Sequence, residues 1–237
     1  MKTEGRNAVL ELLKTDKTID KILMEKNPQG SLNKIFAEAR KKGVRVQFLD
    51  RSVLDKQSES GRHQGVIAFS SDYEYSSLED IIAAKGEKGG FIILCDGIED
   101  VHNLGSIIRV AECAGADGVV IPAVNSASVT EAVVRISAGA ANHVKVAKVT
   151  SINRAIDILK DSGYWTYALE ADGQSIYSAD LTGNIALVIG GEDSGVKRLT
   201  REKCDFCIAL PLYGKVNSLN ASVALGIAAY EAVRKRQ

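Results

Sequence analysis

The amino-acid sequence predicts an α/β protein whose main domain holds a largely parallel sheet, preceded by a smaller α/β domain. From Phe91 onward, short and continuously apolar runs alternate with helical patterns. Such alternation is typical of a parallel sheet covered by helices on both faces. The first seventy residues have strands of mixed character, and a polar stretch separates them from the rest. These observations divide the chain into two domains.

The N-terminal part, residues 1–75, is predicted to be a small α/β domain. Helical patterns cover 4–14 and 31–42, with Ser31 as the expected N-cap and Gly43 just beyond the end. Apolar and β-branched runs predict strands at 18–25, 44–49 and 65–69. Residues 76–89 are rich in Ser, Gly and charge, and are expected to form a linker with one short helix at 77–85.

Residues 90–237 carry the pattern of the main domain. Strands are expected at 91–95, 118–122, 143–149, 164–170, 185–191 and 206–212. Helices are expected at 104–114, 129–137, 153–161, 196–203 and 219–235. No internal repeat or low-complexity tract interrupts this order.

Composition says more about the cellular location of the protein than about its activity. The chain has 237 residues, with 30 basic and 30 acidic side chains, so net charge neither supports nor excludes binding to nucleic acid. No apolar run approaches the roughly 18 residues of a membrane helix. Four cysteines in a chain this long do not make a disulfide framework, and residues 1–17 lack a signal-peptide core. We therefore expect a cytoplasmic protein without a membrane or metal partner.

Three polar stretches follow predicted strands, and open α/β sheets bind ligands at the carboxyl ends of their strands. The first is CDGIEDVHNLGSIIRVAECAG, where Asn103 is the expected N-cap of the next helix. Arg109 follows small residues, Gly105 and Ser106, that would leave its guanidinium room to meet a ligand. An ordinary capped helix with a solvated arginine is the alternative.

The second stretch is LVIGGEDSGV, in which Gly190 and Gly191 end an apolar run and precede Glu192. Paired glycines allow the backbone to approach a planar or anionic ligand closely. The stretch fits no dinucleotide fingerprint, P-loop or nucleophile elbow. A tight turn without a ligand remains the alternative.

The third stretch is LPLYGKVNSLNASVALG, residues 210–226. Ser218 and Asn220 lie near the start of a helix whose backbone N–H groups are free to donate. The helix is rich in Ala, Ser and Gly, which permits very close packing. A tightly packed core helix is the alternative.

Other candidate residues carry less weight. Cys204 and Cys207 form one C-x-x-C pair without a second pair or nearby histidines, so buried thiols fit better than a zinc site. His102 could act as a base, and neither His63 nor His143 has a recognisable partner in the sequence.

Taken together, the three stretches resemble the motif set of the SpoU (TrmH) family of RNA ribose methyltransferases, within the SPOUT superfamily. The matching segments are HNLGSIIRVAECAG, LVIGGEDSGV and LPLYGKVNSLNASVA, in this order across residues 91–237. Residues 1–75, including EGRNAVLELL and HQGVIA, resemble the RNA-binding domain of the RlmB-like branch, which is similar to a ribosomal protein. The resemblance covers essentially the whole chain.

The resemblance implies an enzyme that uses S-adenosylmethionine to methylate a ribose 2′-hydroxyl of RNA. It also implies a C-terminal trefoil knot that holds the cofactor, and a homodimer whose active sites are completed at the subunit boundary. The matching catalytic positions are Asn103, Arg109, Glu192, Ser218 and Asn220. The matching cofactor-binding positions are Gly190, Gly191, Leu210, Pro211 and Leu219.

The sequence does not determine which RNA is the substrate. The RlmB-like branch favours a guanosine of 23S ribosomal RNA, with transfer RNA or a uridine as alternatives. A non-catalytic RNA-binding protein is the rival from another class, and a nucleotide-dependent oxidoreductase is disfavoured because the glycine fingerprint is missing.

Overall fold

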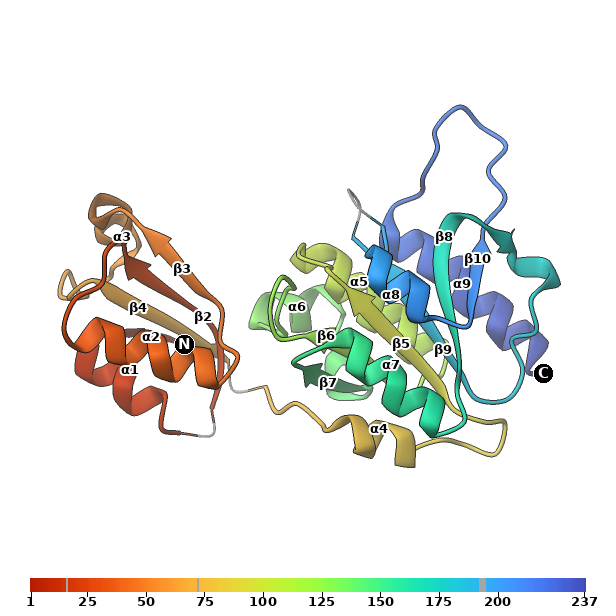
Figure 1. The fold of residues 1–237 in the computed structure, drawn as a ribbon, viewed down its shortest axis with the longest axis horizontal. Coiled ribbons are helices and arrows are strands. Elements are labelled where there is room, and N and C mark those ends of the chain that lie inside the picture. The colour runs from red at the N-terminus through yellow and green to blue at the C-terminus, as the bar shows by residue number, and fades with distance from the viewer. Residues whose placement is uncertain (16, 72, 192–194) are drawn as a thin grey trace. The chain divides into compact units, whose positions relative to one another are not determined.

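The computed structural model describes residues 1–15, 17–71, 73–191 and 195–237. They form two compact units, residues 1–74 and 75–237 (Figure 1). In the described part of the chain, no helix has both the length and the apolar character needed to cross a bilayer.

The first unit is built on a four-stranded sheet in the order β1-β4-β2-β3. Its elements are β1 (Lys2–Glu4), α1 (Arg6–Leu12), β2 (Thr18–Glu25), α2 (Ser31–Lys41), β3 (Val46–Leu49), α3 (Arg51–Gln57) and β4 (Val66–Ser71). Strands β2 and β3 run parallel, whereas β4 is antiparallel to both β1 and β2. This unit is therefore α/β with a mixed sheet.

Helices α1 and α2 cover one face of this sheet. Their buried residues recur three or four positions apart, as in Leu32, Ile35 and Ala39 of α2, and pack against Ile22 and Met24 of β2. On the other face α3 brings Leu54 against Leu23 and Ile67, forming a smaller cluster. The two faces are therefore covered to different extents.

Three local expectations for the first unit were wrong or incomplete. Glu4 does not begin a helix but ends β1, where it pairs with Ile67. Gly30, not Ser31, occupies the N-cap of α2. His63 does have a partner, because its Nε2 lies 2.8 Å from Asp55 Oδ1.

The second unit contains a six-stranded sheet in the order β10-β8-β9-β5-β6-β7. Its strands run parallel, and the sequence predicts a mainly parallel sheet here. Its elements are α4 (Leu78–Ala83), β5 (Phe91–Asp96), α5 (Val101–Cys113), β6 (Gly118–Pro122), α6 (Glu131–Ile136), β7 (Lys145–Val149), α7 (Ile152–Asp161), β8 (Trp165–Ser175), β9 (Ile185–Gly190), α8 (Arg198–Lys203), β10 (Phe206–Ala209) and α9 (Ala221–Lys235). Strand β10 stops short of the expected Leu212, because Pro211 lacks the N–H that a ladder requires.

Helices lie on both faces of the parallel sheet (Figure 1). On one face, α4 and α7 bury Leu78, Ile81, Ile156 and Leu159 against the strands. On the other face α5 packs between α6 and α9. The short helix α4, expected within a linker, is thus anchored in the core of the second unit.

Strand order reverses in the middle of this sheet. From β5 the chain moves outward to β6 and β7, and then returns to the opposite side of β5. There it forms β8, then β9 between β8 and β5, and then β10 at the outer edge. Asp96 at the end of β5 pairs with Gly190 at the end of β9. This is a topological switch point, where open α/β sheets place their ligand sites.

Candidate active site

The first motif follows β5 and forms α5. Asp100, not Asn103, caps this helix: its Oδ1 accepts the backbone N–H groups of His102 and Asn103, each at 2.9 Å. The expected N-cap was therefore wrong, because an acceptor three residues earlier satisfies the free N–H groups. Asn103 instead lies inside the first turn and is 8% exposed.

Arg109 lies farther along α5 and is exposed to solvent. Its side chain forms no hydrogen bond or ion pair with the described residues, which leaves the guanidinium available to an external partner. Gly105 does not provide the room expected for Arg109, because a Cβ on it would lie 2.6 Å from Ile136 Cγ2. Gly105 serves the close packing of α5 on α6.

The third motif meets the first through a direct hydrogen bond. Asn220 Nδ2 donates to Asn103 Oδ1 at 2.9 Å, across 117 positions of sequence. The same Asn220 side chain caps α9, its Oδ1 accepting from the N–H groups of Ser222 at 3.0 Å and Val223 at 3.4 Å. One side chain thus fixes the start of α9 and ties it to the first turn of α5.

Replacing Asn220 with alanine should destabilise the protein through both contacts. Loss of an N-cap costs about 1 kcal/mol, and loss of the bond to Asn103 about 1 kcal/mol more. Asn220→Asp keeps an oxygen for the cap and has no N–H for Asn103, so urea unfolding should place it between alanine and wild type. Equal stability of the aspartate and alanine variants would show that the cap of α9 does not contribute separately from the bond to Asn103.

Gly190 and Gly191 of the second motif lie too close to neighbouring backbone to carry a side chain. A Cβ on Gly190 would lie 1.9 Å from the carbonyl carbon of Gly195, and one on Gly191 would lie 2.8 Å from the Gly97 oxygen. Gly195 N–H donates to the Gly191 oxygen at 2.9 Å, and Gly195 has a φ of +59°. Glu192 lies outside the described residues.

A cavity of about 210 Å³ opens between the second and third motifs. Its lining residues are Leu169, Glu170, Ala171, Ile189, Gly190, Gly191, Gly195, Leu210, Leu212, Asn217, Ser218, Leu219, Ala221 and Ala224. Four of the five expected cofactor-binding residues are among them, and the fifth, Pro211, lies between two of them in the chain. Its walls combine apolar side chains with close backbone, which suits a nucleoside.

Of the expected catalytic residues, the structure places Ser218 in the lining of this cavity. Asn103 and Asn220 contact each other without lining it, and Arg109 is not part of the lining. The segment between β10 and α9 projects from the unit (Figure 1), and Tyr213 within it is 96% exposed.

Two acidic residues at the same edge escaped the sequence analysis. Glu170 lines the cavity, and its Oε1 accepts the Val196 backbone N–H. Asp96 is buried and accepts from both the backbone N–H and the Nζ of Lys197, each at 3.0 Å. Asp96 ends β5, and Glu170 lies in the middle of β8, just beyond the part of β8 that pairs with β9. In the sequence each of them directly ends or follows an expected strand, in the segments YWTYALE and FIILCD, and that position was the available signal.

The remaining candidates show little sign of reactivity. Burial raises the pKa of Cys204 to about 12, and burial also raises the pKa of Cys207, so both thiols stay protonated at neutral pH. Both cysteines are free and half-buried. Within the described ranges, no three or more His, Cys, Asp or Glu side chains gather as a metal-binding group.

Comparison with known proteins adds to this geometry. The family model "SpoU rRNA Methylase family" matches residues 90–230, and the model "RNA 2'-O ribose methyltransferase substrate binding" matches residues 3–76. A putative TrmH family tRNA/rRNA methyltransferase of Bacillus subtilis, YacO, is 43% identical over 237 residues, which cover 98% of this chain and 94% of the relative.

Solved structures agree with the fold. The SpoU methyltransferase AviRb from Streptomyces viridochromogenes, in complex with AdoMet, has a TM-score of 0.64 at 21% identity, covering 100% of this chain and 90% of that one. The TrmH/SpoU tRNA modifying enzyme of A. aeolicus has a TM-score of 0.58 at 27% identity, covering 67% and 80%.

The protein is an RNA methyltransferase with a separate substrate-binding domain. This class follows from the two family matches and agrees with a parallel sheet that has a switch point. The chain belongs to the SpoU family. This confirms the family predicted from the three motifs.

Proposed function

We propose that the protein transfers the methyl group of S-adenosylmethionine to a ribose 2′-hydroxyl, in a guanosine of 23S ribosomal RNA. The observation that carries the proposal is the Asn103–Asn220 hydrogen bond beside the cavity of the second and third motifs. It joins the two ends of the methylase domain at the switch point of the sheet. AdoMet in the AviRb structure supports the choice of cofactor.

The cavity fits the adenosine part of this cofactor. Leu210 and Leu219 offer apolar walls, Gly190 and Gly191 bring the backbone itself to the wall, and Ser218 offers a hydroxyl. S-adenosylmethionine, when bound, supplies a methyl group already activated by its sulfonium. We further propose that the third motif encloses it in a trefoil knot.

The task left to the protein is to position and deprotonate a weakly acidic hydroxyl. Arg109 has an exposed guanidinium and could bind the substrate phosphate, lowering the pKa of the adjacent 2′-hydroxyl or accepting its proton. Asn103 and Glu192 would orient Arg109, and Ser218 and Asn220 would shape the pocket. The fork of the guanidinium suits phosphate contacts that an ammonium cannot reproduce.

The decisive measurement is the modified nucleoside itself. The purified chain is incubated with radiolabelled S-adenosylmethionine and either ribosomal or transfer RNA from a strain lacking its gene. After nuclease digestion we expect labelled 2′-O-methylguanosine from 23S RNA. Label in transfer RNA or in a uridine would select an alternative substrate, and absence of label from every RNA would favour a non-catalytic RNA-binding protein.

We also propose that the enzyme is a homodimer formed through α9. Val223, Ile227 and Tyr230 recur three or four positions apart on this helix and are 51%, 42% and 54% exposed in the single chain. An apolar stripe of this kind on a helix calls for a partner surface. Residues 1–75 would then serve each catalytic domain as a recruiting module for RNA.

Replacing Ile227 with aspartate should convert the dimer to a monomer and abolish methyl transfer, while the affinity for S-adenosylmethionine is retained. Sedimentation velocity at low concentration measures the first effect. Leu199→Asp is the control, because Leu199 is 60% exposed on α8, a helix that packs against α7. Ala224 is less suitable, because it lines the cavity. A fully active wild-type monomer would overturn the dimer.

A further inference from the structure

The first unit presents an ordered row of cations around an aromatic ring. The pairing registers of its sheet place Lys2 of β1 opposite Phe69 of β4, and Phe69 opposite Lys21 of β2. Arg45 directly precedes Val46, which pairs with Ile22, so Arg45 continues the row onto β3. We call Lys2, Phe69, Lys21 and Arg45 the sheet row. It crosses β1, β4 and β2 and ends at the residue before β3.

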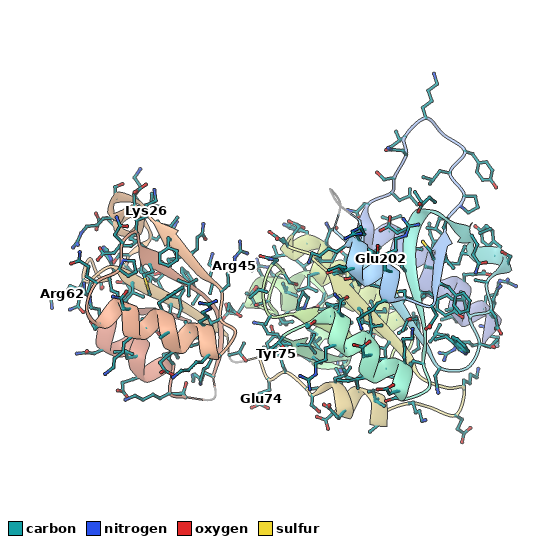
Figure 2. The ribbon with its side chains drawn as sticks, viewed as in Figure 1. Lys26, Arg45, Arg62, Glu74, Tyr75 and Glu202 are labelled. Carbon is teal, nitrogen blue, oxygen red and sulfur yellow. The ribbon has the colours of Figure 1, made fainter. Side chains whose placement is uncertain are left out.

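The sheet row lies on the face opposite α1 and α2. The adjacent row on this face contains Ile67 and Leu23, which α3 buries with Leu54. Phe69 packs at the border of that cluster and stays half-buried, and the neighbouring Lys21 and Arg45 are exposed. Helix α3 thus covers one part of the face and leaves the sheet row partly open to solvent, with Lys21 and Arg45 exposed. Figure 2 labels Arg45 at the start of β3.

The cations of the sheet row differ in whether they already have a hydrogen-bond or ion-pair partner. Lys21 Nζ lies 5.0 Å and Lys2 Nζ 5.9 Å from the centre of the Phe69 ring. Lys2 also donates to the Gln57 oxygen at 2.9 Å and pairs with Glu59 at 2.7 Å. Neither Lys21 nor Arg45 has an ion pair with any residue that the structure describes. Two positive charges are therefore available to an anionic partner.

Shielding of the half-buried Phe69 ring by lysines would explain Lys2 and Lys21 but not Arg45. Arg45 lies two strand spacings from Phe69, roughly 10 Å away. An aromatic face with cations spread along one line is the combination that single-stranded nucleic acid requires, since bases stack on the ring while phosphates meet the charges. Lys and Arg also outnumber Asp and Glu in residues 1–74, although the whole chain is neutral.

We propose that the sheet row is a binding platform for single-stranded RNA, with a base stacked on Phe69 and phosphates contacted by Lys21 and Arg45. This inference rests on the proposed function, because it assigns a surface to the recruitment of the RNA substrate. It names the open sheet face, and not the helical face, as the side of the first unit that meets RNA.

The test measures binding of the full chain to a fluorescein-labelled oligoadenylate by anisotropy, over a series of salt concentrations. Phe69→Leu keeps an apolar side chain and should weaken binding at least about fivefold, the lower end for loss of one stacked base. Lys21→Ala and Arg45→Ala alter exposed positions and should each reduce the steepness of log Kd against log salt by about 0.7.

Matched controls lie on the opposite face. Phe48 is 39% exposed and packs against Phe36 of α2, and Lys34 is exposed on α2 itself. Phe48→Leu and Lys34→Ala should leave both affinity and salt dependence unchanged. Urea unfolding of each variant separates a lost contact from a lost fold.

Unchanged binding by folded Phe69→Leu, or equal effects of Lys34→Ala and Lys21→Ala, would overturn the platform. Methyl transfer is measured on the same samples. A wild type that methylates RNA, with sheet-row variants that bind and methylate equally well, refutes this inference alone. A wild type that binds through the sheet row without methylating any RNA refutes the proposed function and leaves the platform standing.

Discussion

Replacing Arg109 with alanine is expected to reduce methyl transfer by about 10²–10⁴-fold, the range for loss of a group that handles the reacting proton. S-adenosylmethionine affinity should stay close to wild type, because Arg109 is not part of the cavity lining. Fold stability should also be kept, since the side chain is exposed and forms no ion pair with the described residues. Turnover at saturating RNA, together with calorimetric titration of the cofactor, measures both effects.

Two further variants sharpen this result. Arg109→Lys should remain severely impaired, because one ammonium cannot reproduce the planar, forked contacts of a guanidinium. Arg154→Ala removes another exposed arginine, on α7, and should be fully active. Comparable turnover by Arg109→Ala and wild type at saturating RNA would eliminate Arg109 as a catalytic residue.

Replacing Gly190 with alanine is expected to destabilise the methylase unit by about 3 kcal/mol, the upper end for overpacking a core. The added Cβ would lie 1.9 Å from the Gly195 carbonyl carbon, 2.0 Å from its oxygen and 2.1 Å from the Val196 nitrogen. All three are backbone atoms, which cannot rotate away as a side chain does. The backbone of Gly190 or of Gly195 must therefore move, and the cavity that Gly190, Gly191 and Gly195 line must change with it.

Urea unfolding measures the change in stability, and calorimetry should show loss of S-adenosylmethionine binding. Gly86→Ala is the matched control: a Cβ on Gly86 meets no atom within 4 Å and its φ is not positive, so this variant should behave as wild type. A Gly190→Ala protein with wild-type unfolding and cofactor affinity would show that the backbone around Gly190 and Gly195 tolerates displacement.

Much of this architecture was accessible from the sequence, because buried parallel strands reveal themselves locally. The runs at 91–95, 118–122 and 185–191 are apolar throughout, and the structure buries every residue of β5, β6 and β9. The family could be predicted as well, since three ordered motifs carried the resemblance. These features depend on residues that are close together in the chain.

It was harder to predict which of two similar residues caps a helix. Asp100 and Asn103 are both good N-cap types three positions apart, and the sequence does not say which one turns its side chain back to the helix. The three-residue strand β1 depends wholly on its partner β4, so Lys2–Glu4 carries no periodic signal of its own. Such segments take their structure from what packs beside them.

The sequence by itself determined the class of fold, the positions of its buried strands and the motifs that identify the family. Tertiary structure decided which of those segments meet. The pairing of Asp96 with Gly190, the contact of Asn103 with Asn220 and the presence of Glu170 in the cavity all join residues distant in the chain. Hydrophobic periodicity specifies which face of a segment is buried, but strand order depends on long-range packing that no local pattern encodes.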